Sequence, residues 1–217
     1  MSSEIQISIR LLSPPGTIIR RPVPSEAAQS CNPPLFNDAM HVRTVVFVDE
    51  QGCSPESELD EDDHRSWHWV MYDNRSSQQI PIGVIRLVPP PHPPHQIHLN
   101  NNGVNRDTID GHAKQEEPYV KLTRVGLLPA YRGMGLSRKL VDTALNWAVE
   151  HRSEVVSALG VQESWNGLVL VHAQEQVEAL YARMGFVTDK SMGKWDEEGI
   201  MHVGMWKRVD ISNRISP

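Results

Sequence analysis

Residues 119–148 read YVKLTRVGLLPAYRGMGLSRKLVDTALNWA, and their central turn is suited to binding an anion. Gly133 and Gly135 carry no side chain that would block a ligand, while Arg132 and Arg138 offer charge-assisted donors. A helical pattern begins at Leu136, and the first amides of a helix are unpaired beside the positive end of its dipole. This combination favours a phosphate or pyrophosphate ligand.

Two widespread phosphate motifs do not fit this turn. A P-loop requires Gly-x-x-x-x-Gly-Lys-Ser/Thr, and no Gly-Lys pair follows here. A dinucleotide fingerprint requires a third glycine where Arg138 stands, and it requires alternating β-α-β units that the rest of the chain lacks. A plain strand–helix turn that uses glycine only for its backbone angles remains the alternative to a ligand site.

Acidic residues form a second group that could take part in binding or catalysis. Residues 49–63, DEQGCSPESELDEDD, carry eight acids and no base. The simpler interpretation is a solvated loop, and the functional one is a rim that attracts a cationic substrate, with Asp60 and Asp63 as candidate substrate-binding residues. His92, His95 and His98 recur at spacing three, but no cysteine or carboxylate stands at a recognised offset, so we expect no metal site.

The elements that position these residues follow from hydrophobic periodicity. Strands are predicted at 5–12, 66–73, 80–89, 120–128, 167–173 and 200–209, and helices at 35–51, from 136 onward and at 174–184. Gly52 and Gly185 stand where helices commonly end. Residues 89–118 are rich in turn-forming residues and are expected to form an insertion between strands.

One irregularity interrupts the strand before the turn. Its apolar positions step by two from Val120 to Leu122, by three to Val125, and by two again to Leu127. An odd step in a period-two pattern predicts a bulge near Thr123 and Arg124. Arg124 is then free either to pair with the acidic loop or to face a ligand.

Length and composition are typical of one α+β domain spanning residues 1–217, with a mostly antiparallel sheet and helices on its faces. No apolar run approaches the length of a membrane span, and the first ten residues lack the apolar core of a signal peptide, so we expect a cytoplasmic protein, with a nuclear one not excluded. The net charge of −6 argues against nucleic acid as the main partner. Cys31 and Cys53 are expected to stay reduced.

VGLLPAYRGMGLSRKLV resembles the acetyl-CoA motif of the GCN5-related N-acetyltransferases (GNAT), Arg/Gln-x-x-Gly-x-Gly/Ala. Arg132, Gly135 and Ser137 fall on its three positions, and Ser137 departs from the usual Gly or Ala. The flanks RTVVFVDEQG, ELDEDDHRSWH and DEEGIMHVGM resemble the ElaA-like branch of this superfamily. The resemblance covers about residues 35–208, and it explains neither the N-terminal connection nor the insertion.

A second motif lies further along the chain. QEQVEALYARMGF is similar to the family pattern Asn-x-x-Ala-x-x-x-Tyr-x-x-x-Gly-Phe. Tyr181, Gly185 and Phe186 match this pattern, whereas Gln174 and Val177 replace the usual Asn and Ala. Two motifs in the expected order are more specific than either motif alone.

The resemblance implies a GNAT-like three-layer sandwich that transfers an acetyl group from acetyl-CoA to a primary amine by direct attack, without a metal. It implies that Tyr181 is the general acid and that Glu50 is the first candidate for the general base, with Asp60, Asp63, His68 and His172 as the other candidates. The implied cofactor-binding residues are Val125, Gly126, Leu127, Arg132, Gly133, Met134, Gly135, Leu136, Ser137, Arg138 and Gln174.

The partner implied by the resemblance is a small-molecule amine, with no nucleic acid and no membrane, and a homodimer through the C-terminal strands stays open. Two alternatives remain. One is a protein or peptide N-acetyltransferase. The other is a catalytically weak acyl-CoA-binding regulatory protein, an alternative supported by the departures from the family motifs at Ser137, Gln174 and Val177.

Overall fold

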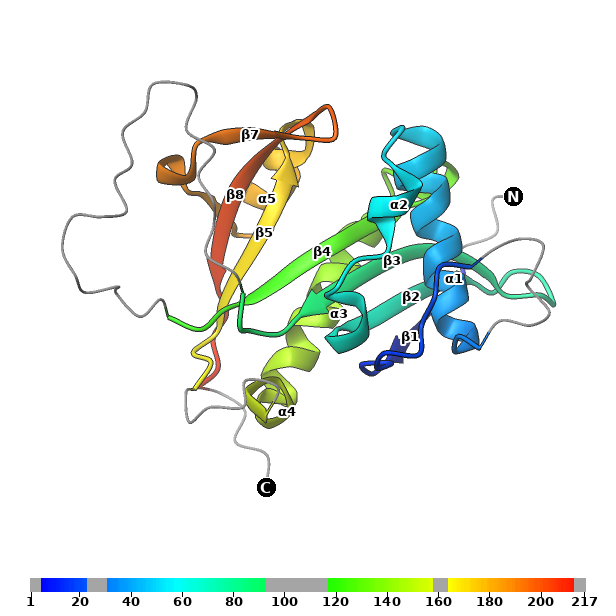
Figure 1. Cartoon of the computed structure of the whole chain (residues 1–217), viewed down its shortest axis with the longest axis horizontal. Coiled ribbons are helices and arrows are strands. Elements are labelled where there is room, and N and C mark those ends of the chain that lie inside the picture. The colour runs from blue at the N-terminus through cyan, green and yellow to red at the C-terminus, as the bar shows by residue number, and fades with distance from the viewer. Residues whose placement is uncertain (1–4, 23–30, 93–116, 158–163, 213–217) are drawn as a thin grey trace.

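A computed structural model describes residues 5–22, 31–92, 117–157 and 164–212, and these residues form one sheet with helices on both faces (Figure 1). The strands are ordered β1-β2-β3-β4-β5-β8-β6, with β7 paired to β8. Their bounds are β1 Ile7–Leu12, β2 Trp67–Asp73, β3 Ile80–Val88, β4 Val120–Leu127, β5 Leu168–Gln174, β6 Val187–Thr188, β7 Lys194–Glu197 and β8 Ile200–Arg208. Among the described strands only β4 and β5 pair in parallel, so the predicted mixed, mostly antiparallel sheet is confirmed.

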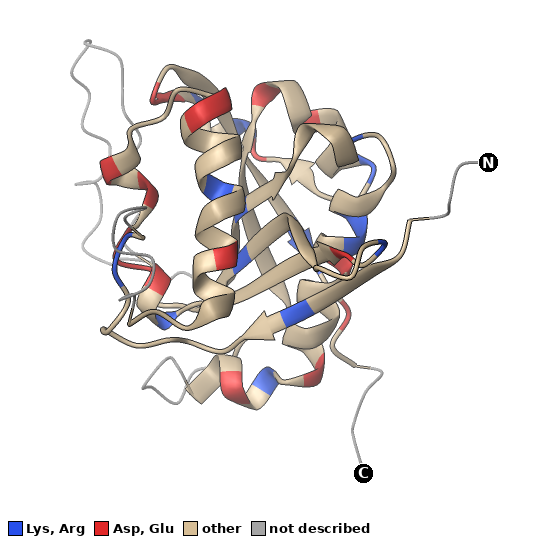
Figure 2. Cartoon of the chain, turned by 90° about the vertical axis from the view of Figure 1, so that its right-hand side faces the viewer, with Lys and Arg blue, Asp and Glu red and all other residues tan. Residues whose placement is uncertain are grey.

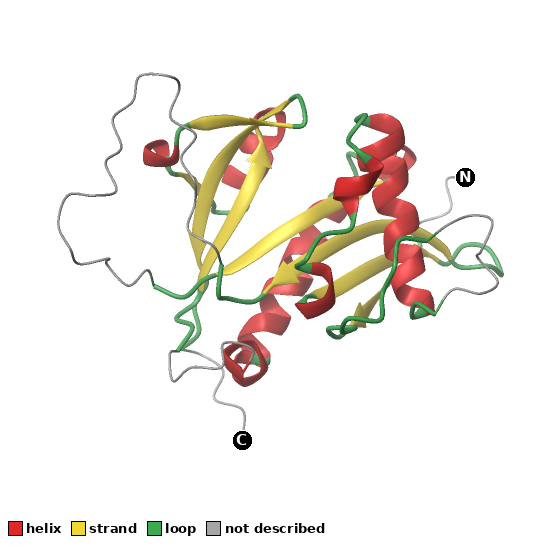
Figure 3. Ribbon diagram, in the orientation of Figure 1, coloured by secondary structure: helices red, strands yellow, loops and turns green. Residues whose placement is uncertain are grey.

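The two longest helices cover opposite faces of this sheet (Figure 3). α1 (Pro34–Arg43) continues as a π-helix over Thr44–Glu50 and packs Ala39, Val42 and Val46 on one face. α3 (Leu136–Glu150) packs on the other face. The shorter helices are α2 Pro55–Glu58, α4 Arg152–Ser157 and α5 Glu178–Ala182.

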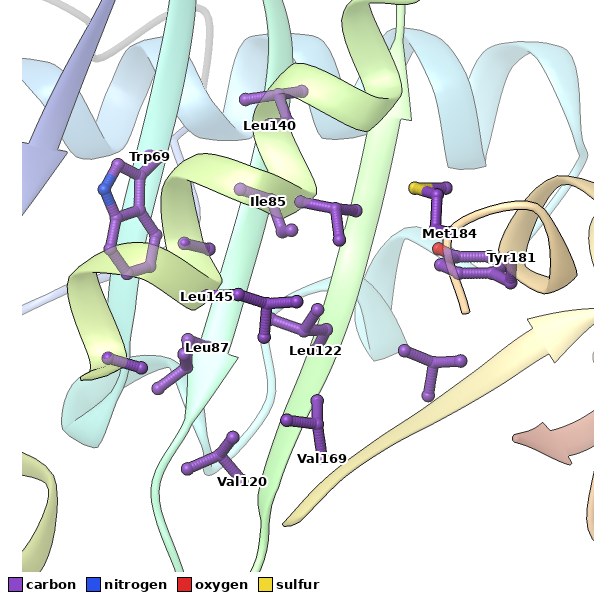
Figure 4. Packing of buried hydrophobic residues seen from close by; sticks show 14 of the residues in the cluster. Trp69, Ile85, Leu87, Val120, Leu122, Leu140, Leu145, Val169, Tyr181 and Met184 are labelled. Atoms are coloured by element: carbon purple, nitrogen blue, oxygen red, sulfur yellow. The ribbon is translucent and has the colours of Figure 1, made fainter. Parts of the chain in front are cut away.

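The position of α3 is fixed by its apolar stripe. Six side chains at helical spacing are 0–6% exposed: Leu136, Leu140, Val141, Ala144, Leu145 and Ala148. Figure 4 shows Leu140 and Leu145 pointing at Ile85, Leu87 and Leu122 of the sheet. Burial of this stripe holds the start of α3, and the glycine-bearing turn before it, beside the end of β4.

The bulge predicted from the apolar spacing of β4 is present. Thr123 pairs with Arg86 and Gly126 with Val84, so Arg124 and Val125 together oppose one residue of β3. Arg124 has φ of 51°, a left-handed conformation that costs a non-glycine residue of the order of 1 kcal/mol or more. Such strain persists only where surrounding contacts hold it.

β4 and β5 separate directly after this point. They pair only from Val120–Val169 to Leu122–Val171, and Figure 1 shows the two strands diverging beyond that junction. From Thr123 onward, the edge of β4 that faces β5 has no strand beside it among the described residues. The sheet therefore contains a gap with strand edges on both sides.

Other elements differ from expectation at their boundaries. The helix expected at 174–184 is shorter, because Glu175–Val177 form a 3₁₀ turn before α5, and Gly185, with φ of 86°, follows it as predicted. The sequence did not predict α4, β6 or β7. Cys31 and Cys53 are free.

The expected insertion is described only at its ends, and His95 and His98 lie outside the described residues. His92 is stacked on Tyr119, and its Nε2 lies 3.0 Å from the Tyr119 carbonyl oxygen. The described residues hold no group of three metal-ligating side chains. They also include no helix with the length and apolar character of a membrane span.

Candidate active site

A cavity of about 630 Å³ occupies the gap between β4 and β5. Residues 122–127 of β4 form one wall, and His172, Ala173 and Gln174 of β5 form the other. The π-helical end of the first helix contributes Val46, Phe47, Glu50 and Gln51, and the β7–β8 hairpin contributes Glu197, Glu198, Ile200 and His202. Val125, Gly126, Leu127, Arg132 and Gln174, which were predicted from the sequence to bind the cofactor, all line this cavity.

The π-helical segment matters because it brings Phe47 against β4. A Cβ at Gly126 would lie 3.4 Å from Phe47 Cζ, so a larger side chain at position 126 would enter this contact. π-Helical turns often occur at functional sites, where they redirect side chains that a regular helix would place elsewhere. Here the segment ends at Glu50 and Gln51, and both residues line the cavity.

The remaining predicted cofactor residues lie at the turn that follows Arg132. Gly133 and Gly135 have φ of 77° and 74°, a conformation that glycine adopts without strain. A Cβ at either position would meet nothing within 4 Å, and no side chain caps the start of α3. Arg138 donates to the Arg183 carbonyl at 2.5 Å, and Leu136 is buried, so Leu136 can offer a ligand only its backbone.

Glu50 and Arg132 form a bidentate ion pair. The two Arg132 Nη atoms each lie 2.6 Å from a Glu50 carboxylate oxygen, and Arg132 Nε donates to the Leu127 carbonyl at 3.0 Å. The hydrogen bonds from Arg132 lower the pKa of the Glu50 carboxyl. The carboxylate is therefore ionised at neutral pH, but it is a weaker proton acceptor while this pair is intact.

Tyr181 lies in the wall of the cavity. Its side chain is 7% exposed, its ring packs edge-on against Phe186 at 5.6 Å, and Figure 4 shows its hydroxyl end on the side of β4. No hydrogen bond joins this hydroxyl to another of the described residues. Burial raises the pKa of Tyr181 above its ordinary value, so the phenol keeps its proton through the neutral range.

Two polar bridges cross the gap in the sheet. Gln174 Nε2 donates to Gln51 Oε1 at 2.7 Å. On the far side of the cavity, the Ser54 amide donates to Glu198 at 2.5 Å, and the Ser57 hydroxyl donates to the same carboxylate. Glu198 and Gly199 both have positive φ and form the tight turn of the β7–β8 hairpin. The first helical region is thus connected to the C-terminal part of the sheet.

The acidic segment turns inward at three positions. Glu58, Asp60 and Asp63 pair with Arg43, Arg86 and Arg124 through N–O distances of 2.5–3.1 Å. The Asp63 side chain has no exposed surface, and neither Asp60 nor Asp63 lines the cavity. Arg124 therefore faces the acidic loop, and its two ion pairs hold the strained bulge. Figure 2 shows acidic and basic positions interspersed over this side of the molecule.

Several cavity residues were not identified as site candidates from the sequence. Phe47 lies in the helix predicted at 35–51 but was given no role in the site, and Glu197, Glu198 and His202 belong to a hairpin of which only the second strand was predicted. His202 Nδ1 lies 2.8 Å from the Ile200 carbonyl oxygen. Their only sequence signal was the segment DEEGIMHVGM, which carried family resemblance without roles for individual residues.

Comparison with known proteins agrees with this arrangement. The family model described as the acetyltransferase (GNAT) family matches residues 34–186. The chain belongs to this family. A Bacillus subtilis (strain 168) protein whose name places it among the acetyltransferases is 29% identical over 177 residues, covering 81% of this chain and 90% of that protein. The uncharacterized N-acetyltransferase YjcF of the same organism is 25% identical over 176 residues, covering 81% and 94%.

Solved structures show the same fold at lower identity. Escherichia coli ElaA aligns with a TM-score of 0.57 at 18% identity, over 94% of this chain and all of that one. An acyl-CoA N-acyltransferase from Pseudomonas aeruginosa aligns with a TM-score of 0.54 at 21% identity, over 94% and 99% of the two chains. This GNAT-family chain is thus an acyltransferase, and the expected open mixed sheet flanked by helices is confirmed.

Proposed function

We propose that this GNAT acyltransferase moves the acetyl group of acetyl-CoA to a primary amine of a small molecule by direct attack in a ternary complex. The observation that carries the proposal is the Tyr181 hydroxyl. It is buried and protonated, and it faces a cavity bounded by the unpaired edge of β4. A proton donor placed beside an open strand edge suits a reaction in which an extended thioester is held and its thiolate is released.

In this proposal, the edge of β4 binds one part of acetyl-CoA and the turn before α3 binds another part. Backbone groups of Val125, Gly126 and Leu127 bind the pantetheine arm, since this edge of β4 lacks a neighbouring strand. Their amides also stabilise the oxyanion of the attacked carbonyl. The uncapped start of α3 and Arg132 bind the pyrophosphate. NatC, which aligns with a TM-score of 0.53 at 15% identity, was solved with CoA and a peptide.

The attacking amine must lose a proton, because an alkyl ammonium of pKa ~10.4 is neutral in only about one part in 10³ at pH 7. We assign the general base to Glu50. While Glu50 is paired with Arg132, its lowered pKa makes it a poor base. A pyrophosphate competes for Arg132, and its binding releases the carboxylate at the edge of the cavity.

A direct attack is favoured over an acetyl-cysteine intermediate. Cys53 is the thiol that lines the cavity. Burial, followed by Glu198 and Glu58, raises the pKa of this thiol, so the reactive thiolate is scarce at neutral pH. Asp60 and Asp63, predicted as substrate-binding, act indirectly in this proposal, because they hold the arginines behind the bulge.

The test combines acetyl-CoA titration calorimetry with an amine library and mass-spectrometric detection of acetylated products. We expect saturable acetyl-CoA binding and acetylation of at least one small primary amine. The Glu50→Gln variant should keep the cofactor affinity within a few fold and lose most of the turnover. Acetylation of peptides but of no small amine, or binding without transfer to any acceptor, would replace this proposal with one of the two alternatives.

A further inference from the structure

The charged groups that line the cavity are unevenly neutralised. Its lining includes four glutamates but only two arginines, Arg124 and Arg132, and no lysine among the described residues. Arg132 is paired with Glu50, and Arg124 with Glu58 at 3.1 Å. These pairs use both cations of the lining. The two remaining carboxylates, on Glu197 and Glu198, have no arginine or lysine within ion-pair distance among the described residues.

Both carboxylates stand on the β7–β8 hairpin, on the side of the cavity away from the turn that precedes α3. The Ser57 hydroxyl and the Ser54 amide donate to the Glu198 carboxylate and lower its pKa, and Arg124 lowers this pKa further without an ion-pair contact. Glu197 is exposed, and its contact is the Trp195 indole nitrogen at 3.4 Å. Hydrogen bonds hold the Glu198 carboxylate in place, and Arg124 and Lys121 act on Glu198 and Glu197 only from beyond ion-pair distance, so both carboxylates still attract a cation.

A second feature of the same cavity points to a ligand. The Tyr181 side chain is more than nine-tenths buried, and its hydroxyl opens into the same cavity without a hydrogen-bond partner among the described residues. A hydroxyl that opens into a cavity can bond to water or to a ligand that enters the cavity. A ligand that reaches Tyr181 past the hairpin passes two uncompensated carboxylates.

We propose that the acceptor is a small aliphatic dication that carries a second ammonium group and no carboxylate. One ammonium group is bound by Glu197 and Glu198, while the other loses its proton and attacks the thioester. Once the attacking amine has lost its proton, the diamine still supplies one ammonium group to the two carboxylates, a monoamine supplies none, and an amino acid adds a like charge. This inference rests on the proposed acetyl transfer and defines its acceptor.

Three acceptors of matched length test the inference: 1,4-diaminobutane, butylamine and 4-aminobutyrate. For the wild-type protein, we expect kcat/KM to be about tenfold higher for the diamine than for butylamine, because one more ammonium–carboxylate contact forms. The tenfold ratio is calculated after dividing the diamine kcat/KM by two, because the diamine has two equivalent amino groups that can react. The amino acid should be the poorest acceptor, and 0.5 M salt should shrink the diamine preference.

The variant Glu197→Gln/Glu198→Gln should reduce the diamine preference to the statistical twofold while butylamine turnover continues, since glutamine can still accept the Ser54 bond. Glu154→Gln, on the exposed surface of α4, is the matched control and should keep the full preference. Equal kcat/KM for diamine and monoamine in the wild type, or a preference that survives the double substitution, would overturn the inference and leave the acetyl transfer standing. If no amine of any kind is acetylated, the proposed function fails first, and the inference fails with it.

Discussion

The substitution Tyr181→Phe separates chemistry from packing at this site. Because the hydroxyl makes no hydrogen bond to the described residues, its removal breaks no bond, and phenylalanine preserves the edge-on contact with Phe186. We therefore expect the free energy of unfolding to change by less than about 1 kcal/mol. Acetyl-CoA affinity should stay within about threefold, since the ring that shapes the wall is retained.

Turnover should respond very differently. A positioned general acid contributes ~10²–10⁴-fold to a rate, so kcat should fall by at least about a hundredfold. Since burial raises the pKa of the phenol, the protonated form that donates is present throughout the ordinary assay range. Loss of this proton should therefore cause no fall in wild-type kcat up to about pH 10.

A second tyrosine supplies the control. Tyr72 donates its hydroxyl proton to Asp38 at 2.6 Å and does not line the cavity. Tyr72→Phe removes a hydrogen bond to a charged group, so it should lower stability by ~1.5–3 kcal/mol and leave kcat unchanged. Thermal melts, calorimetry and thiol-release kinetics measure the three quantities. A Tyr181→Phe protein with wild-type kcat would refute the role of the hydroxyl, whatever its stability.

Three further predictions concern the surroundings of the site. Asp63→Asn should lower the free energy of unfolding by ~3–5 kcal/mol in urea titrations, because it leaves two buried arginines short of a charge. His68 is buried, and desolvation lowers its pKa from 6.5 to about 4. As pH falls, the imidazole is therefore protonated in the unfolded chain before it is protonated in the folded chain. Stability should drop by ~3 kcal/mol between pH 6.5 and 4, and a flat profile there would contradict the assignment. Gly126→Val should narrow the slot beside Phe47 and weaken acetyl-CoA binding at least about tenfold, as measured by calorimetry, while the melting temperature changes little.

Local sequence patterns predicted much of the sheet and the β4 wall of the cavity. The odd apolar step in β4 predicted the bulge because a bulge shifts the phase of side-chain alternation, a property visible in a single strand. The glycines at 133 and 135 predicted the turn for the same kind of reason, since a left-handed backbone conformation selects residues locally.

The hairpin side of the cavity could not be predicted in this way. Whether the acidic side chains are solvated or held in ion pairs depends on Arg86 and Arg124, which approach the acidic segment from strands distant in the sequence. A run of acids that would be a solvated rim on its own therefore becomes partly an interior ion-pair network. Glu197 and Glu198 belong to a short hairpin whose strand β7 has little apolar alternation, and the place of Glu198 opposite Ser54 follows only from the folded sheet.

The three-residue junction of β4 and β5 has a consequence for how this sheet avoids misassembly. Sheets usually protect their outermost strands, because unpaired amides and carbonyls recruit strands from other chains. Here the separation creates two such edges in the middle of the sheet, from Thr123 on one side and beyond Val171 toward β4 on the other. An added strand needs ~4.8 Å of lateral spacing on each side. The Gln51–Gln174 and Ser54–Glu198 hydrogen bonds join the segment after α1 to β5 and to the β7–β8 hairpin, so they restrain the two sides of the gap from separating far enough to admit a foreign strand.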